Sequence, residues 1–126
     1  MAEKILIVED ERNLRRLYQM ELEQDGYEVT TAADGQSALR RLADGPVDLV
    51  LLDLALPDGS GLDYLQQFME MHRHVKVVIN TAYPLYKRDF HCWAADAFLI
   101  KTSDLTELKS TIDHFLHEPQ YELQKG

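Results

Sequence analysis

The sequence has little cysteine, little positive charge and no long apolar run. Its 126 residues include a single cysteine, Cys92, so no disulfide can form within the chain, as is typical of a reducing compartment. Lysine and arginine number 13 against 22 acidic residues, and the net charge of -9 argues against a surface that coats nucleic acid. The first residues lack the flanks and length of a signal peptide, and no run could span a membrane. We therefore expect a cytoplasmic domain that binds no membrane and makes no direct contact with nucleic acid.

What the sequence does contain is the composition of one ordinary folded domain. Apolar residues make up 45% and charged residues 28% of the chain, which is typical of a globular protein and not of a disordered one. A chain of this length buries most of a single core. There is no internal repeat or low-complexity tract. We assign residues 1–119 to one domain and residues 120–126 to a polar C-terminal tail or a truncated linker.

Strand-like apolar runs alternate with helix-like stretches five times along the chain. The expected strands are Lys4–Glu9, Tyr27–Thr31, Val47–Asp53, Val75–Thr81 and Ala97–Ile100. The expected helices are Arg12–Gln24, about Asp34–Ala43, a stretch from Leu62 to His72, a stretch from Pro84, and one from about Asp104 that Pro119 ends. Connections this short between parallel strands predict right-handed crossovers and a doubly wound α/β sheet.

Apolar spacing and capping residues add detail to three of these helices. The first helix is expected to bury a face formed by Leu14, Leu17, Tyr18 and Leu22. It is expected to stop at Asp25-Gly26. Asp34 is placed to cap the second helix. Asp104 and Glu107 have the spacing of a capping box at the start of the last helix.

Polar residues stand just after four of the apolar runs: Asp10, Asp53, Thr81 and Lys101. A parallel sheet buries its strands and gathers their carboxyl ends along one edge. Residues that end such strands therefore meet at one site, however far apart they lie in the sequence. Carboxylates, a hydroxyl and an ammonium gathered there suit a hard divalent cation and a phosphoryl group.

Motifs around these residues resemble a known family. The segments ILIVEDE from Ile5, LVLLDLALPDGSG from Leu49, VVINTA from Val77 and AADAFLIKTSDLTEL from Ala94 resemble the receiver domain of two-component response regulators. The resemblance covers nearly the whole chain, in order and at the family's spacing. It implies a flavodoxin-like fold with five helices and a five-stranded parallel sheet in the order 2-1-3-4-5, which places the site between strands one and three.

The resemblance also implies a role for each residue of an acidic cluster. Asp53 resembles the phosphoacceptor, Asp10 would ligate Mg²⁺ directly, and Glu9 would reach the ion mainly through water. Asp53 and the backbone carbonyl of Ala55 would complete the protein ligands. Clustered carboxylates repel one another, and a divalent cation offsets that repulsion and keeps the nucleophile anionic. Ligands that are all oxygen suit Mg²⁺ better than Zn²⁺.

Further residues match the family's phosphorylation switch. Lys101 and Thr81 would stabilise charge on the phosphoryl oxygens. The phosphorylated aspartate would then draw the Thr81 hydroxyl inward, and Phe98 would turn into the vacated space, as the family's aromatic switch residue does. That change would alter the surface formed by helix four, strand five and helix five. The phosphoryl donor would be a histidine kinase or a histidine phosphotransfer protein, and the downstream effector or fused output domain stays unknown.

Two departures from the family pattern carry information. Thr102 follows Lys101 where receivers usually have proline. Because a cis bond before a non-proline residue costs about 2.5–4 kcal/mol, we expect this peptide to be trans. Ala55 has no polar group to orient an attacking water, and Tyr83 is bulky enough to obstruct one. We therefore expect a fairly long-lived phosphoryl group.

These features favour a phosphorylation-controlled switch over a turnover enzyme; it would catalyse only its own phosphorylation and dephosphorylation. One alternative is a phosphorylation-independent interaction module on the same fold, which the set of polar strand-end residues disfavours. Another is a flavodoxin-like phosphohydrolase with Asp53 as nucleophile. Phosphatases of the haloacid dehalogenase type carry a second acid two residues after the nucleophile, and Ala55 stands there in this chain.

Overall fold

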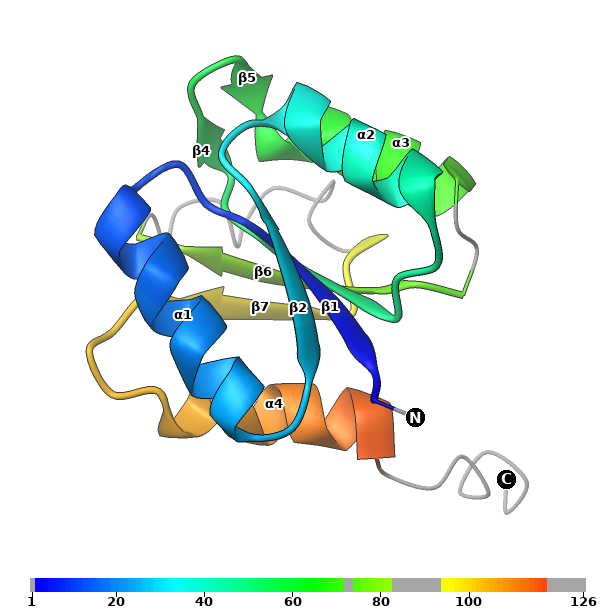
Figure 1. Ribbon diagram of the computed structural model, residues 1–126. Coiled ribbons are helices and arrows are strands. Elements are labelled where there is room, and N and C mark those ends of the chain that lie inside the picture. The colour runs from blue at the N-terminus through cyan, green and yellow to red at the C-terminus, as the bar shows by residue number, and fades with distance from the viewer. Residues whose placement is uncertain (1, 72–73, 83–93, 118–126) are drawn as a thin grey trace.

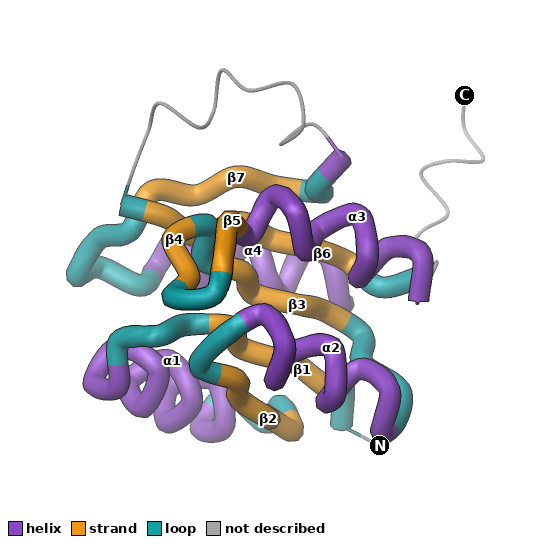
Figure 2. Tube along the Cα trace, turned by 90° about the horizontal axis from the view of Figure 1, so that it is seen from above, coloured by secondary structure: helices purple, strands orange, loops and turns teal. Residues whose placement is uncertain are grey.

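A computed structural model describes residues 2–71, 74–82 and 94–117, and they form a parallel sheet between two layers of helices (Figure 1). The strands of the main sheet are β1 (Lys4–Val8), β2 (Glu28–Ala32), β3 (Leu49–Leu52), β6 (Lys76–Thr81) and β7 (Ala97–Ile100). Their order is β2-β1-β3-β6-β7, with every pairing parallel (Figure 2). If only the five strands of this sheet are numbered along the chain, their order is 2-1-3-4-5, as predicted. The predicted flavodoxin-like α/β fold is confirmed.

The described helices cover both faces of the sheet. They are α1 (Arg12–Gln24), α2 (Gly35–Asp44), α3 (Gly61–Met71) and α4 (Thr106–His117). Helices α1 and α4 lie on one face, and α2 and α3 lie on the other (Figure 1). The helix predicted from Pro84 lies outside the described residues, so α4 is the fifth helix of the prediction. Within the described ranges, no helix has both the length and the apolar character needed to cross a bilayer.

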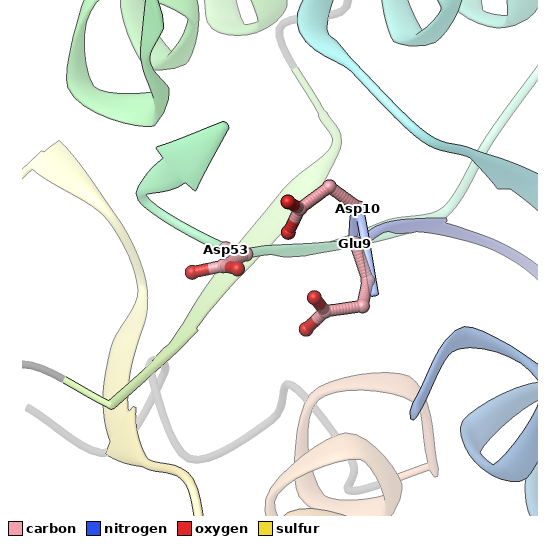
Figure 3. A group of neighbouring side chains, drawn as sticks. All are labelled: Glu9, Asp10 and Asp53. Carbon is pink, nitrogen blue, oxygen red and sulfur yellow. The ribbon is translucent and has the colours of Figure 1, made fainter. Parts of the chain in front are cut away.

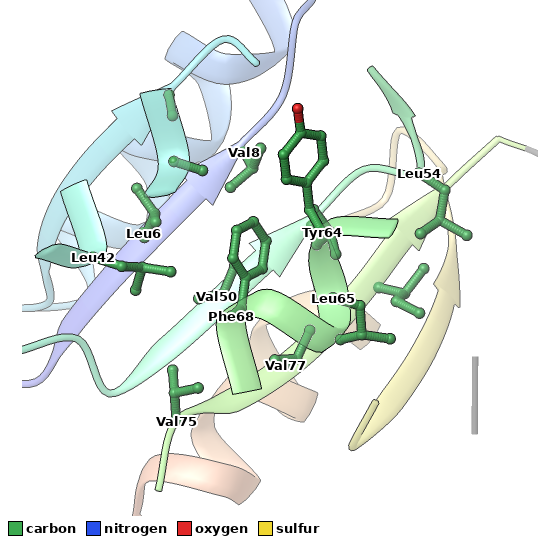
Figure 4. Close-up of a cluster of buried hydrophobic side chains, with 14 residues drawn as sticks. Leu6, Val8, Leu42, Val50, Leu54, Tyr64, Leu65, Phe68, Val75 and Val77 are labelled. Atoms are coloured by element: carbon green, nitrogen blue, oxygen red, sulfur yellow. The ribbon is translucent and has the colours of Figure 1, made fainter. Parts of the chain in front are cut away.

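Four of the five main strands are largely apolar because both faces of the sheet are covered there, whereas the edge strand β2 alternates with polar residues. In β1, Leu6 and Val8 face α2 and α3 (Figure 4), whereas Ile5 and Ile7 face α1 and α4. All four side chains are at most 1% exposed. Full burial of one such side chain contributes about 1.5–3 kcal/mol relative to leaving it in water. The two clusters fix the sheet in place and leave its carboxyl edge open for polar residues.

Helix α1 buries a narrower face than the sequence predicted. Tyr18 and Leu22 are 2% and 1% exposed, but Leu17 is 42% exposed. Each residue advances about 100° around a helix, so Leu17 lies about 100° away from Tyr18 and turns off the sheet. The prediction that Leu17 joins the buried face was wrong. The predicted stop is confirmed, because the helix ends at Gln24 and Gly26 has a φ of 97°.

The predicted caps had different outcomes. The Asp34 carboxylate accepts the Ser37 N–H at 2.7 Å, and that cap is confirmed. The Asp104 carboxylate accepts the Thr106 N–H at 2.9 Å, but the Asp104 N–H bonds to the Thr102 hydroxyl. Glu107 is therefore not the reciprocal partner of Asp104 that a capping box requires.

A small hairpin lies beside the sheet, in a stretch where no strand or helix was predicted from the sequence. β4 (Ala55–Leu56) pairs with β5 (Gly59–Ser60) in antiparallel fashion. Strands of two residues are too short to produce a periodic pattern, so sequence spacing could not reveal them. The carboxylate of Asp58, in the turn, accepts the Gly35 and Gln36 N–H groups at 3.0 and 3.1 Å. These bonds hold the hairpin against the start of α2.

Two other carboxylates support the opposite, amino end of the sheet. Asp48 accepts the Lys4 N–H at 2.7 Å, where β1 begins. Asp96 accepts the Val77 N–H at 2.8 Å, near the start of β6. Both acids satisfy backbone donors that the sheet itself leaves without a partner, which stabilises the two strand starts.

Candidate functional site

The carboxyl ends of four strands bring the predicted polar residues to one edge of the sheet. Backbone hydrogen bonds extend the ladder past the strand ends: Asp53 N–H donates to Val8 at 3.0 Å, and Lys101 N–H donates to Thr81 at 2.8 Å. Likewise, the Glu9 N–H, just after β1, donates to the carbonyl oxygen of Ala32 at the end of β2 at 3.0 Å. These bonds fix where each side chain starts, so the positions of the site residues follow from the sheet.

Three carboxylates form the centre of the site: Glu9, Asp10 and Asp53 (Figure 3). One ligand oxygen from each lies within 4.8 Å of the others. Glu9 and Asp53 are only 2% and 5% exposed, whereas Asp10 is exposed. The site therefore has a buried floor formed by two acids and an open side at the third.

Lys101 links the two buried acids. Its ammonium lies 2.6 Å from Oε1 of Glu9 and 3.0 Å from Oδ2 of Asp53. The remaining oxygens also have donors, since Oδ1 of Asp53 accepts the Ala55 N–H at 3.2 Å and Oε2 of Glu9 accepts the Glu11 N–H at 3.1 Å. Every oxygen of the two buried carboxylates thus has a hydrogen-bond partner, as buried charge requires.

The electrostatics of the site follow from burial and pairing. Burial raises the pKa of Glu9, and the bond from Lys101 offsets only part of that effect. Burial alone would lower the pKa of Lys101, but its bonds to Glu9 and Asp53 outweigh burial and hold the pKa above its ordinary value. Lys101 is therefore a permanent cation at the floor of the site.

Thr81 and the strand residues around it are tightly packed. Thr81 is fully buried at the end of β6. Its neighbour Asn80 points to the opposite face of the sheet, where its side-chain amide donates to the buried Tyr18 hydroxyl at 3.1 Å. Phe98, on β7, lies opposite Ile79 of β6. It is partly buried and packs against the hydrophobic cluster between the sheet and helices α2 and α3. Sequence spacing gave no sign of the bond between Asn80 and Tyr18.

The structure also tests the peptide after Lys101 and the close packing behind Asp53. No described peptide bond is cis, so the predicted trans bond to Thr102 is confirmed.

A Cβ on Gly61 would lie 2.6 Å from the carbonyl oxygen of Asp53. Only glycine fits there, which the sequence did not reveal. Tyr83, the second residue predicted to prolong the life of a phosphoryl group, lies outside the described residues.

The donor set fits a magnesium ion. Magnesium prefers oxygen ligands at about 2.0–2.1 Å, which puts opposite ligands about 4.2 Å apart. Carboxylate oxygens within 4.8 Å of one another need only a small adjustment to reach that spacing. The exposed side at Asp10 leaves room for water ligands, which Mg²⁺ retains. The three acids are therefore suited to hold Mg²⁺, with the Ala55 carbonyl nearby on β4.

Comparison with known sequences agrees with this geometry. The profile of the family described as "Response regulator receiver domain" matches residues 5–113. The response regulator ArlR of Staphylococcus saprophyticus is 35% identical over 122 residues, covering 95% of this chain and 56% of ArlR. ArlR of Staphylococcus aureus strain Mu50 is 33% identical over the same length. The chain thus spans about half the length of the curated relatives it matches.

Solved structures are similar as well. The Thermotoga maritima response regulator TrrA in complex with Mg(2+)-BeF has a TM-score of 0.87 and 38% identity, covering 90% of this chain and 99% of that one. TrrA in complex with the histidine kinase ThkA has a TM-score of 0.84, also at 38% identity, covering 90% and 98%. A CheY-like receiver domain protein from Methanospirillum hungatei JF-1 has a TM-score of 0.89 at 26% identity over the whole of both chains.

Proposed function

The chain belongs to the response regulator receiver domain family, and on that basis we propose that Asp53 accepts a phosphoryl group from a histidine kinase or a histidine phosphotransfer protein. The observation that carries the proposal is the setting of the Asp53 carboxylate. It is 5% exposed, and its two oxygens contact the Lys101 ammonium and the Ala55 N–H. A nucleophile held between a cation and an amide donor is already oriented for attack.

The transfer step follows from these contacts. An Asp53 oxygen attacks phosphorus in line, a P–O bond forms, and the P–N bond of the donor's phosphohistidine breaks. The imidazole leaves with the electron pair of that bond and takes up a proton. Lys101, 3.0 Å from Oδ2 of Asp53, offsets charge on the phosphoryl oxygens, and the Thr81 hydroxyl donates a further bond. The product is an acyl phosphate on Asp53.

We propose Mg²⁺ as the cofactor. Glu9, Asp10, Asp53 and the carbonyl of Ala55 would hold it, Glu9 mainly through water. The ion would supply positive charge that lets three clustered carboxylates stay ionised beside an incoming phosphoryl group. Support comes from the spacing of the acids and from TrrA, a similar receiver whose structure is a complex with Mg(2+)-BeF.

The proposed output is a two-state change that begins at Thr81. Movement of its hydroxyl toward the phosphoryl group would leave space into which Phe98 turns. Support comes from the place of Phe98, which is only partly buried and lies on an edge strand of the sheet, β7, where its ring is not enclosed on all sides. The affected surface would be that of β7, α4 and the segment between β6 and β7. The effector that reads it is unknown.

The chain acts, in this proposal, as a switch that catalyses only its own phosphorylation and dephosphorylation. The donor class agrees with the complex between TrrA and the histidine kinase ThkA. Ala55 stands where a phosphohydrolase of the haloacid dehalogenase type needs an acid, and it has no side-chain donor or acceptor. Steady release of phosphate from monoesters would contradict this assignment.

The direct test is the mass of the intact protein after incubation with an acyl phosphate and Mg²⁺. We expect one added phosphoryl group, labile to base and hydroxylamine, and none in the presence of EDTA. Asp53→Asn should abolish it. Asp63→Asn is the matched control, because Asp63 is an exposed acid in the first turn of α3.

Two results would reject the proposal. An adduct of equal yield on the Asp53→Asn variant would place the chemistry elsewhere. A folded wild-type protein that stays unmodified by both an acyl phosphate and a phosphorylated kinase would favour the interaction module that works without phosphorylation.

A further inference from the structure

The guanidinium of Arg15 holds the segment between β1 and α1. Arg15 lies near the start of α1, and its Nη1 donates to the carbonyl oxygen of Glu9 at 2.9 Å and to that of Asp10 at 3.2 Å. These carbonyls belong to the short link between Val8, where β1 ends, and Arg12, where α1 begins. One side-chain nitrogen therefore fixes two consecutive peptide groups that lie between the two elements.

The bond to the backbone of Asp10 matters most, because the Asp10 carboxylate itself has no hydrogen-bond donor among the described residues. The carboxylates of Glu9 and Asp53 are each held by hydrogen bonds and by the Lys101 ammonium. Within residues 2–71, 74–82 and 94–117, the Asp10 carboxylate makes no hydrogen bond or ion pair, yet an oxygen of it lies within 4.8 Å of the other two acids. Among the described residues, Asp10 is thus held through its backbone carbonyl, to which Arg15 donates.

We propose that Arg15 is a positioning residue of the metal site: by pinning the carbonyls of Glu9 and Asp10, it directs the Asp10 carboxylate toward Asp53. The inference rests on the proposed function, since it presupposes that Mg²⁺ binds these acids. Arg15 itself would contact neither the ion nor the reacting atoms. It acts in the way that outer-shell partners orient metal ligands in other sites.

Electrostatics and positioning predict opposite effects of removing Arg15. The guanidinium is a permanent positive charge beside the acidic cluster, so it repels a divalent cation. If charge were its only contribution, a neutral residue at this position would strengthen Mg²⁺ binding. If it positions Asp10, the same substitution must weaken binding. The sign of the change in affinity therefore distinguishes the two roles.

The experiment compares Mg²⁺ affinity, by isothermal titration calorimetry, in the unphosphorylated full chain and three variants. Arg15→Met removes the donor and keeps an unbranched side chain of similar helix propensity. Arg16→Met is the matched control, because Arg16 is the next residue on α1, is exposed, and its side chain makes no hydrogen bond or ion pair within the described ranges. Arg15→Lys restores charge and a nitrogen donor. Melting curves recorded in EDTA measure the stability of each fold without metal.

Loss of an outer-shell partner typically lowers metal affinity by about 10–100-fold, and we expect about a tenfold loss in Arg15→Met. Arg16→Met should bind as the wild type does or slightly more tightly, and Arg15→Lys should recover part of the loss. Arg15→Met and Arg16→Met should melt at similar temperatures in EDTA.

Equal or tighter binding in Arg15→Met than in Arg16→Met would overturn the inference. So would a loss that Arg15→Lys does not relieve at all. If the wild type itself binds no Mg²⁺, the proposed metal site fails first, and that result is distinct from a failure confined to Arg15.

Discussion

The Lys101 ammonium lies 2.6 Å from Oε1 of Glu9, although Lys101 follows β7 and Glu9 follows β1, with β6 and β3 between these two strands. The pair joins an edge strand to an inner strand across the floor of the site. It also places a fixed positive charge where a divalent cation would approach. In the proposed function Lys101 would therefore have two opposed effects, since it would favour an incoming phosphoryl group and disfavour a bound metal ion.

Replacing Lys101 should separate these effects. Two unit charges about 4 Å apart interact by about 1 kcal/mol in water and about 4 kcal/mol near a protein surface, so Lys101→Met should tighten Mg²⁺ binding by at least about fivefold. The same variant should be phosphorylated more slowly by an acyl phosphate. Titration calorimetry and intact mass measure the two effects. Lys109→Met, which removes a lysine paired with Glu21 and Asp25, is the control. Weaker Mg²⁺ binding in Lys101→Met would show that the ammonium mainly arranges the acids.

Gly61→Ala should disturb Asp53, the proposed phosphoacceptor, by contact with its backbone. The new Cβ would lie 2.6 Å from the Asp53 carbonyl oxygen and 2.8 Å from Cα of Leu54. Overpacking of this kind costs about 1–3 kcal/mol, and urea denaturation measures it. Gly45→Ala is the control, because a Cβ there meets nothing within 4 Å and the φ of 173° is open to any residue. Equal stability of the two variants would contradict the contact.

Asp58 should stabilise the fold although it is exposed. Its carboxylate accepts the Gly35 and Gln36 N–H groups and the Tyr64 hydroxyl. The bond from Gly35 is the main reason why the pKa of Asp58 lies below its ordinary range. Removal of a helix-capping carboxylate costs about 0.5–2 kcal/mol, so Asp58→Ala should lower the free energy of unfolding by about 1 kcal/mol. Tyr64→Phe should cost less, and an Asp58→Ala variant as stable as the wild type would refute the anchor.

Tyr27 should make the protein less stable in alkali. Burial raises the pKa of Tyr27 to about 12, from an ordinary value of 10.0. Between these values the unfolded chain loses the phenolic proton while the folded chain keeps it, so stability falls as the pH rises through this window. The effect is at most about 2–3 kcal/mol, because one pKa unit corresponds to about 1.4 kcal/mol. Urea midpoints across that window should therefore fall less steeply in Tyr27→Phe than in the wild type. Parallel curves would show that the Tyr27 hydroxyl makes no contribution.

The phosphoryl group should be lost faster when a polar side chain replaces Ala55. The Ala55 side chain has no group that orients water, and the residue is exposed beside the acids. Ala55→Asn adds a donor and acceptor at that point, and a several-fold faster loss of phosphate is expected, since positioned groups that assist attack commonly contribute more than this. Decay of the intact-mass adduct after removal of the donor gives the rate. An unchanged rate would mean that water reaches phosphorus from another side.

The sequence predicted the sheet because its signals were repeated and local. Four of the five parallel strands are apolar runs covered on both faces, and the acids and the lysine follow them directly. Once the strands pair in order, their carboxyl ends must meet, so the convergence of Glu9, Asp53 and Lys101 was predictable without knowing any distance. Their chemical roles are still predictions.

What the sequence did not predict depends on contacts between distant elements. From the sequence alone, Arg15 is predicted to be a solvent-exposed helix residue. Its bonds to the carbonyl oxygens of Glu9 and Asp10 become evident only in the structure. The partner of Asp58 is the start of α2, more than twenty positions earlier, and no local pattern encodes that pairing. Leu17 has the same periodicity as its buried neighbours, and only the width of the covered face shows that it is exposed.

The acids Asp48 and Asp96 lie at the amino end of the sheet and bond to backbone amides, whereas the acids of the proposed site lie at the carboxyl end. Replacement of the former should lower the yield of folded protein and leave the chemistry of each folded molecule intact. A genetic screen for signalling would not distinguish substitutions at the two ends of the sheet, because both would reduce the signal. Activity measured per amount of folded protein would distinguish them. The length of a strand thus separates acids that stabilise the sheet from acids that are available for chemistry in the proposed site.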